Sequence, residues 1–283
     1  MMFDIGPFAM SWHGFWSFIG ILVAVFLVAR WAKRDGISTD IAYDVALWGI
    51  LGGIIGARLM HVFDNTDYYF ENPGKIFAVW QGGIGFLGAM IGGILAGGIF
   101  AKIKNYPVGK IADYAAPAMA IAHIIGRIGD IWNGEHLSTP TDLPWGWVFS
   151  HPNSPGRIGA ERLFNDPNIA VHPAVVYEMI WNAFTILFLF KSRGKFKMDG
   201  SLWIIYMFMY SIGRFIIQFT RMDDVKFSIG NLGIQEAHIV TFSLFIITLI
   251  LSILFLRVKG NNSDNDQKIK KASGRKRKSQ ARA

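Results

Sequence analysis

The sequence contains no cysteine, and charged residues are scarce in it. The absence of cysteine excludes disulfide bonds, metal sites built from thiolates and a cysteine nucleophile. Charged residues make up 17% of the 283 residues, whereas they make up about 25% of an average soluble protein. Hydrophobic residues make up 52%. This composition argues against an ordinary soluble domain and predicts a membrane protein.

Seven apolar stretches are long enough to cross the hydrocarbon core of a bilayer, which takes about 20 helical residues. They cover residues 14–31, 41–62, 76–101, 108–132, 171–190, 201–220 and 237–256. Helices are the expected form, because lipid offers no partner to an unpaired backbone group. The segment before the first stretch, residues 1–12, carries no lysine or arginine, and the stretch lacks a small-residue cleavage site, so we expect it to be retained rather than removed as a signal peptide. The predicted fold class is an all-α polytopic membrane protein with seven transmembrane helices.

Lysine and arginine are distributed unequally between the two sides of this predicted bundle. One side holds most of them, and the opposite loops hold only Lys75, Arg157, Arg162, Arg221 and Lys226. Because basic loops stay in the cytoplasm, the N-terminus is predicted to lie outside and the C-terminus inside. Residues 1–259 are expected to form the membrane domain, with a small external cap at 133–172. Residues 260–283 are expected to form a disordered basic tail that contacts anionic lipid rather than nucleic acid.

Three arginines inside predicted spans lie at a similar depth. Arg58, Arg127 and Arg214 are four, five and six residues from the external ends of their spans, about 6–9 Å below the outer boundary at 1.5 Å per residue. Glu178 lies at a similar depth in the fifth span. Ionisable residues inside a bilayer are costly and are functional candidates, and a guanidinium suits a phosphate because it donates two parallel hydrogen bonds. The arginine layer predicts an anion site; a purely structural ion pair is the alternative, strongest for Arg58.

Two helix faces add polar residues near this level. One face of the fourth span carries His123, Arg127 and Asp130, and one face of the sixth carries Tyr210, Arg214, Gln218 and Arg221. The many glycines of the third span are expected to allow close helix packing; the alternative is a helix break at 81–88 that brings backbone to a ligand. The sequence has no metal-ligand spacing and no nucleotide-binding loop, so no metal or cofactor is predicted.

Residues 126–136, Gly-Arg-Ile-Gly-Asp-Ile-Trp-Asn-Gly-Glu-His, resemble the signature of bacterial prolipoprotein diacylglyceryl transferases, G-R-x-G-N-F-x-N-x-E. Residues 172–178 resemble the family's H-P-x-x-x-Y-E, and residues 210–214 resemble its Y-x-x-x-R. The resemblance extends from about residue 12 to residue 257, in the order of the family's seven helices. This long pattern is far more specific than a short glycine motif.

The resemblance implies the first step of lipoprotein maturation, at the outer face of the bacterial inner membrane. There the diacylglyceryl group of phosphatidylglycerol moves to the thiol of the lipobox cysteine in a preprolipoprotein signal peptide. The leaving phosphate must be held, and the thiol must lose a proton. Arg127 and Arg214 are expected to act catalytically on the phosphate. The expected substrate-binding residues are Arg58, Arg127, Asp130, Asn133, Glu135, Glu178, Tyr210 and Arg221.

Several residues depart from the family pattern. The family's F-H-G-G on the third span, whose histidine is the implied thiol base, is Phe-Leu-Gly-Ala at residues 86–89. His13, His123 and His136 are the alternative bases, and His13, which stands where the family has tyrosine, is the preferred prediction. Asp130 replaces the asparagine of the signature.

Two other functions remain open from the sequence. The loss of the family histidine allows a catalytically weak paralogue that binds or flips phospholipids. A small-anion transporter would also need arginines within the membrane. The transporter is disfavoured, because the arginines lie near one face rather than at the midplane, where transporters bind their substrates.

Overall fold

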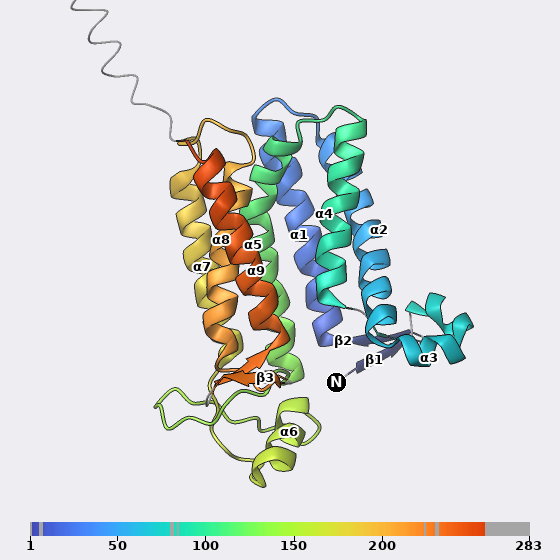
Figure 1. The fold of residues 1–283 in the computed structure, drawn as a ribbon, viewed down its shortest axis with the longest axis vertical. Coiled ribbons are helices and arrows are strands. Elements are labelled where there is room, and N and C mark those ends of the chain that lie inside the picture. Colours follow the sequence, from blue (N-terminus) through green and yellow to red (C-terminus); the bar gives the residue numbers. More distant parts are fainter. Residues whose placement is uncertain are drawn as a thin grey trace, which may run out of the picture.

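The computed structural model describes residues 2–5, 8–79, 82–83, 85–223, 225–229 and 232–257. A bundle of long helices dominates it (Figure 1). These are α1 (Trp12–Arg34), α2 (Thr39–Asp64), α4 (Phe86–Ile103), α5 (Val108–Asn133), α7 (Ala174–Ser192), α8 (Ser201–Gln218) and α9 (Glu236–Phe255). Helix α2 packs mainly on α4, α1 on α5, and α8 on α9, while α5, α7 and α8 contact one another. The tail predicted at 260–283 lies outside the described residues.

Short elements gather at one end of the bundle (Figure 1). They are the hairpin of β1 (Met2–Ile5) and β2 (Phe8–Ser11), helix α3 (Thr66–Glu71), the 3-10 helix η1 (Pro73–Phe77), helix α6 (Pro155–Phe164), and the hairpin of β3 (Val225–Ile229) and β4 (Leu232–Gln235). Both hairpins are antiparallel, and Val225 pairs with Gln235 in the second. The prediction of an all-helical chain missed these hairpins, because strands of four or five residues give only a weak periodic signal.

Within the described residues, five helices are long and apolar enough to cross a membrane: α1, α2, α7, α8 and α9. Helix α4 contributes a shorter apolar segment, Leu87–Ile103, and α5 is long but more polar; both lie alongside the five (Figure 1). Large apolar side chains remain exposed along the helices, among them Ile55, Ile180 and Ile253. So much exposed apolar surface is unusual for a soluble monomer, and the helices fit a polytopic membrane protein.

The third predicted span begins at Phe86 rather than at residue 76. Before it, residues 73–77 form η1, and Gly82 and Gly83 have φ angles of +83° and +75°. Glycine adopts this left-handed conformation without a steric cost, and it interrupts the helix. After Phe86, the glycines bring α4 against α2: a Cβ on Gly92 would lie 3.0 Å from the Cα of Gly56. The stretch therefore contains a backbone break first and a close helix contact after it.

Pairing between two loops brings the ends of α5 and α8 together. Residues 137–139 lie beside residues 220–222, and Ser138 and Arg221 form an isolated antiparallel bridge. The backbone N–H of Thr139 donates to the carbonyl of Thr220 at 2.8 Å. This contact places the residues that follow the signature next to those that follow the sixth predicted span.

Candidate active site

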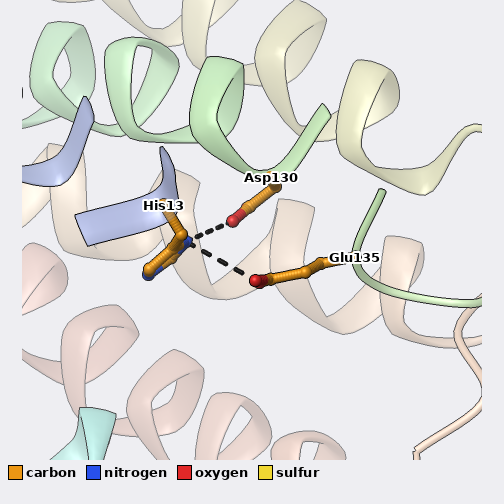
Figure 2. A group of neighbouring side chains, drawn as sticks. All are labelled: His13, Asp130 and Glu135. Atoms are coloured by element: carbon orange, nitrogen blue, oxygen red, sulfur yellow. Dashed lines mark hydrogen bonds and ion pairs between the residues drawn. The ribbon is translucent and has the colours of Figure 1, made fainter. Parts of the chain in front are cut away.

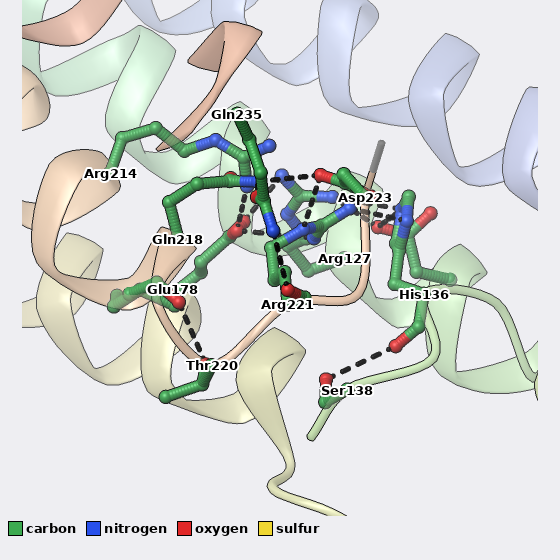
Figure 3. A network of polar contacts seen from close by, with 12 residues as sticks. Arg127, His136, Ser138, Glu178, Arg214, Gln218, Thr220, Arg221, Asp223 and Gln235 are labelled. Carbon is green, nitrogen blue, oxygen red and sulfur yellow. Dashed lines mark hydrogen bonds and ion pairs between the residues drawn. The ribbon is translucent and has the colours of Figure 1, made fainter. Parts of the chain in front are cut away.

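Three arginines converge on Glu178 of α7 (Figure 3). One carboxylate oxygen of Glu178 forms an ion pair with Arg127 of α5. The other accepts from Arg214 of α8 and lies 3.4 Å from Nη1 of Arg221, which follows α8. Glu178 is 6% exposed, and a buried carboxylate stays ionised only when it is paired. The arginines therefore compensate its charge and tie α5, α7 and α8 together.

The three guanidinium groups differ in their access to a ligand. The side chains of Arg127 and Arg214 are 24% and 17% exposed, whereas that of Arg221 is 4% exposed. Arg127 and Arg214, which the sequence predicts as catalytic, are thus the two members of the cluster that a ligand can reach more readily.

Asp130 is the second buried carboxylate of the site, 1% exposed. Its Oδ2 accepts from Nη1 of Arg127 at 2.5 Å and lies 3.4 Å from Nε2 of His136. Its Oδ1 is bonded to Nδ1 of His13. Since Asp130 follows Arg127 by three residues on α5, the two side chains share a helix face. Asp130 thereby links the arginine cluster to the start of α1.

His136 connects Asp130 to Arg221. Its Nδ1 lies 2.6 Å from Nη2 of Arg221. Because a guanidinium only donates hydrogen bonds, Nδ1 is the acceptor in this contact, and Nε2 lies 3.4 Å both from Oδ2 of Asp130 and from Nη1 of Arg127. The backbone of His136 has a φ of +66°, a conformation that is uncommon for histidine and costs free energy. Both ring nitrogens of His136 are engaged within the cluster.

His13, at the start of α1, points toward Asp130 and Glu135 (Figure 2). Its Nδ1 is bonded to Asp130 and lies 3.9 Å from Oε2 of Glu135. Asn133 donates to the other oxygen of Glu135 at 2.7 Å. The contact requires glycine at position 129, where a Cβ would lie 2.8 Å from the Cα of His13. The signature glycine thus lets α1 approach α5 closely enough for His13 to reach the signature carboxylates.

In the described part of the chain, His13, Asp130 and Glu135 form a group that could hold a metal ion, since their ligand atoms lie within 4.8 Å of one another. A cation there would lie beside the guanidinium of Arg127, which shares Asp130, and the like charges would repel each other. The charge distribution therefore favours hydrogen bonding over metal coordination at this cluster.

A polar layer supports Arg221 from the side of the β3–β4 hairpin (Figure 3). Gln218, fully buried, donates to Asp223 at 2.6 Å and to the side chain of Gln235. Gln235 in turn donates to the carbonyl of Arg221 at 2.9 Å. Burial raises the pKa of Asp223, but the charge of Arg221 and the hydrogen bond from Gln218 outweigh it and hold this pKa below its ordinary value of 3.8. Sequence reasoning missed Asp223 and Gln235; only the nearness of Asp223 to Arg221 along the chain pointed to it.

Tyr210 and His123 lie deeper along the same helices. Their rings are 5.7 Å apart, and Nδ1 of His123 lies 3.2 Å from the hydroxyl of Tyr206. The hydroxyl of Tyr210 makes no hydrogen bond within the described part of the chain, so it can serve a ligand. His123 pairs with a tyrosine rather than with the carboxylates of the site.

Arg58 does not join the other arginines, which corrects the expectation of one layer containing all three. Its donors bind the carbonyls of Lys75, Ile76, Gly82 and Gly83 at 2.5–2.9 Å. The guanidinium also lies 5.2 Å from the ring centre of Tyr69. Arg58 holds the chain before α4 against α2. Arg221, rather than Arg58, is the third arginine that pairs with Glu178. The position of a residue along its helix predicts its depth in the membrane, but it does not predict which helices pack against each other.

Comparisons with known proteins support the resemblance that the signature indicated. The family model described as prolipoprotein diacylglyceryl transferase matches residues 1–254. A phosphatidylglycerol–prolipoprotein diacylglyceryl transferase of Trichormus variabilis is 35% identical over 242 residues, covering 83% of each chain. That of Lysinibacillus sphaericus is 34% identical over 257 residues, covering 91% of this chain and 92% of the relative.

A third relative agrees with these two. The phosphatidylglycerol–prolipoprotein diacylglyceryl transferase of Staphylococcus aureus is 33% identical over 259 residues, which are 92% of this chain and 89% of the relative. The matches cover the helices that carry Arg127, Glu178 and Arg214, and they confirm the family predicted from the sequence. The chain belongs to the prolipoprotein diacylglyceryl transferase family and is a transferase.

Proposed function

We propose that this protein transfers the diacylglyceryl group of phosphatidylglycerol to the thiol of the lipobox cysteine in preprolipoproteins. The charge balance of the buried cluster carries the proposal. Three guanidinium groups, those of Arg127, Arg214 and Arg221, face two buried carboxylates, Glu178 and Asp130. One positive charge is left over inside the cluster. The phosphodiester of phosphatidylglycerol carries one negative charge and accepts the paired donors of a guanidinium.

Two further carboxylates near this cluster, Glu135 and Asp223, are more exposed than Glu178 and Asp130. Glu135 faces His13 at 3.9 Å, and its side chain is 28% exposed. Asp223 lies 3.4 Å from Arg221, but its side chain is 44% exposed, so solvent screens its charge. Arg221 itself is occupied by Glu178 and His136. The lipid phosphate is therefore assigned to Arg127 and Arg214, the more accessible pair, with Glu178 and Arg221 holding them in place.

The same proposal places the site near the outer leaflet of the bacterial cytoplasmic membrane. It takes α1, α2, α4, α5, α7, α8 and α9 as seven spans, with the N-terminus outside and residues 133–172 as an external cap. Arg127 and Arg214 lie near the C-terminal ends of α5 and α8, and Glu178 lies near the start of α7. These helix ends lie at the end of the bundle that holds α6 and the β3–β4 hairpin (Figure 1). At the opposite end, the basic residues Lys33, Arg34, Lys102 and Lys104 lie at the C-terminal ends of α1 and α4, which favours a cytoplasmic location for that end.

The reaction makes two demands that these residues meet. The sulfur of the cysteine forms a bond to the glyceryl carbon, and the bond from that carbon to the phosphate oxygen breaks. The electron pair leaves with glycerol phosphate, whose charge grows from one to two negative units. Arg127 and Arg214 stabilise the added charge, an effect worth about 10²–10³-fold in rate for a single donor. His13 is the proposed acceptor of the thiol proton, since Leu87 stands where the family has histidine.

Three polar residues beside the cluster are assigned to the glycerol headgroup. The hydroxyl of Tyr210 makes no hydrogen bond within the described residues, and Asn133 orients Glu135 at the edge of the site. Hydroxyl groups of the headgroup both donate and accept hydrogen bonds, so a tyrosine and a carboxylate suit them.

The test is transfer by the purified protein in vesicles of phosphatidylglycerol, with a lipobox peptide as acceptor. We expect the peptide to gain the mass of one diacylglyceryl group and an equal amount of glycerol phosphate to be released. A peptide with serine in place of cysteine, or vesicles of phosphatidylcholine alone, should give no product. Lipid exchange between vesicles with an unmodified peptide would overturn the proposal in favour of a phospholipid-binding or flipping protein.

A further inference from the structure

We propose that Asp130 is a positioning residue that holds His13 as the base for the thiol, through a carboxylate–imidazole pair joining α5 to α1. The inference rests on the proposed function, because it assigns the proton transfer of that reaction. The sequence predicts that Asp130 binds substrate. In the structure, however, one of its oxygens is hydrogen-bonded to His13 (Figure 2). The other oxygen accepts a hydrogen bond from Arg127.

The bond to Asp130 determines which nitrogen of His13 is available. Asp130 lies among three positively charged or hydrogen-bonding partners, so it is ionised and accepts. The proton of the neutral imidazole is therefore on Nδ1, and Nε2 keeps its lone pair. The side chain of His13 is 47% exposed, and Figure 2 shows the ring extending away from the two carboxylates. Nε2 can receive a proton from a thiol that approaches this open side.

The surroundings of His13 favour the charged ring that forms when it takes the proton. Asp130 and Glu135 are the carboxylates that face it, Arg127 is the nearest cation, and His136 lies behind Asp130. Two negative charges against one positive charge stabilise an imidazolium. Fixing the imidazole tautomer and stabilising the imidazolium is the role that a carboxylate has beside a catalytic histidine.

The other two candidate histidines lack this arrangement. Both nitrogens of His136 are engaged, one by Arg221 at 2.6 Å and the other facing Asp130 at 3.4 Å. His123 lies 3.2 Å from the hydroxyl of Tyr206 and has no carboxylate partner among the described residues. Of the three, His13 alone combines an oriented ring with an open nitrogen.

Asp130 also sets the separation between the proposed base, His13, and the arginine assigned to the lipid phosphate, Arg127. Its Oδ1 holds the base, and its Oδ2 holds Arg127, which is assigned to the phosphate. A thiol at Nε2 of His13 therefore lies close to a lipid whose phosphate is held by Arg127. In the step, the S–H bond breaks toward Nε2, the sulfur electron pair forms the C–S bond, and the C–O electron pair leaves with the phosphate. Charge and protons balance without a further reactant.

The experiment compares two acceptor peptides, one with cysteine and one with selenocysteine at the lipobox position. A selenol is ionised at neutral pH and needs no base. We expect Asp130→Asn and His13→Gln to lower kcat for the cysteine peptide by about 10²–10⁴-fold, the usual contribution of a general base. For the selenocysteine peptide, both variants should stay within about tenfold of the wild type. Asp67→Asn, an exposed carboxylate on α3, is the matched control and should change neither rate.

The pH profile gives a second readout that a merely structural role would not move. With the cysteine peptide, the rate of the wild type should rise with pH along a limb set by His13. In Asp130→Asn the midpoint of this limb should shift to lower pH, because an amide no longer stabilises the imidazolium. Glu135→Gln should shift it in the same direction by a smaller amount.

The possible outcomes separate this inference from the proposed function. An equal loss of rate with both peptides, or an unmoved pH limb, would overturn the positioning role while transfer by the wild type stands. No transfer by the wild type with either peptide would instead remove the proposed function. If Asp130→Asn does not fold, His13→Gln carries the comparison, since its side chain is half exposed.

Discussion

Two buried arginine sites lie at the same end of the helix bundle, and they differ in what their guanidinium groups contact. Among the described residues, Arg58 donates to backbone carbonyls of the segment before α4 and to no side chain. Arg127 donates to the carboxylate of Asp130, Arg214 donates to that of Glu178, and both form ion pairs with Glu178. A backbone carbonyl is neutral and part of the fold, whereas a carboxylate partner can give way to another anion. The comparison indicates that Arg58 serves the fold, and it supports the proposal that Arg127 and Arg214, which are partly exposed and paired with carboxylates, bind the lipid phosphate.

The largest expected effect comes from removing an arginine of the carboxylate-bound site. Arg127→Ala or Arg214→Ala should lower transfer by at least about 10²–10³-fold, because charge on the leaving phosphate loses its partner. Lysine should not restore the rate, since an ammonium cannot donate the paired hydrogen bonds of a guanidinium. The measurement is steady-state lipidation of a lipobox peptide. Arg34→Ala, exposed at the opposite end of the bundle, is the control, and a wild-type rate in either active-site variant would contradict the comparison.

Removing Arg58 should have a structural effect instead. Arg58→Ala leaves four carbonyls without their charged donor, and we expect the free energy of unfolding to fall by at least about 1–3 kcal/mol. The segment at residues 75–79 should become sensitive to protease, while the Kd of the folded fraction for phosphatidylglycerol stays at the wild-type value. Thermal unfolding and lipid binding measure these two properties. An unchanged Tm together with a weakened lipid Kd would place Arg58 in the ligand site after all.

Helices α2 and α4 pack closely next to the Arg58 site. Two glycines can test this contact. A Cβ on Gly56 would lie 3.0 Å from the Cα of Gly92, whereas a Cβ on Gly98 would meet nothing within 4 Å. Gly56→Ala should therefore destabilise the protein by about 1–3 kcal/mol through overpacking. Gly98→Ala should leave stability unchanged or raise it by up to about 1 kcal/mol. Equal Tm values for the two variants would show that the glycine contact does not hold these helices.

The smallest expected effect concerns Asp223, at the exposed edge of the carboxylate-bound site. Its pKa is held below 3.8 in the folded protein, so its ion pair with Arg221 stabilises the fold at higher pH. This contribution is lost as the pH falls through the folded-state pKa. Because the side chain is 44% exposed, the contribution is at most about 1 kcal/mol. Asp223→Asn should lower stability slightly at neutral pH and reduce the loss of stability below pH 4; denaturant unfolding at both pH values measures this.

Much of the fold and part of the site could be predicted from local sequence. Apolar runs of helical length located the long helices, apart from the start of the third at Phe86. The spacing of Arg127 and Asp130 placed both on one face of α5, and the signature around them predicted the family that the comparisons confirm. These features depend on periodicity and composition within one segment, which a linear sequence records directly.

The tertiary structure decided which of these residues meet. His13 and Asp130 are 117 positions apart, and they touch because Gly129 lets α1 lie against α5. Arg221 rather than Arg58 shares Glu178, because pairing of residues 137–139 with 220–222 draws the ends of α5 and α8 together, while Arg58 stays with α2 and α4. Helix period and depth place a side chain on a face and at a level. The choice of its partner depends on how whole helices pack, and that is settled by contacts between segments far apart in the chain.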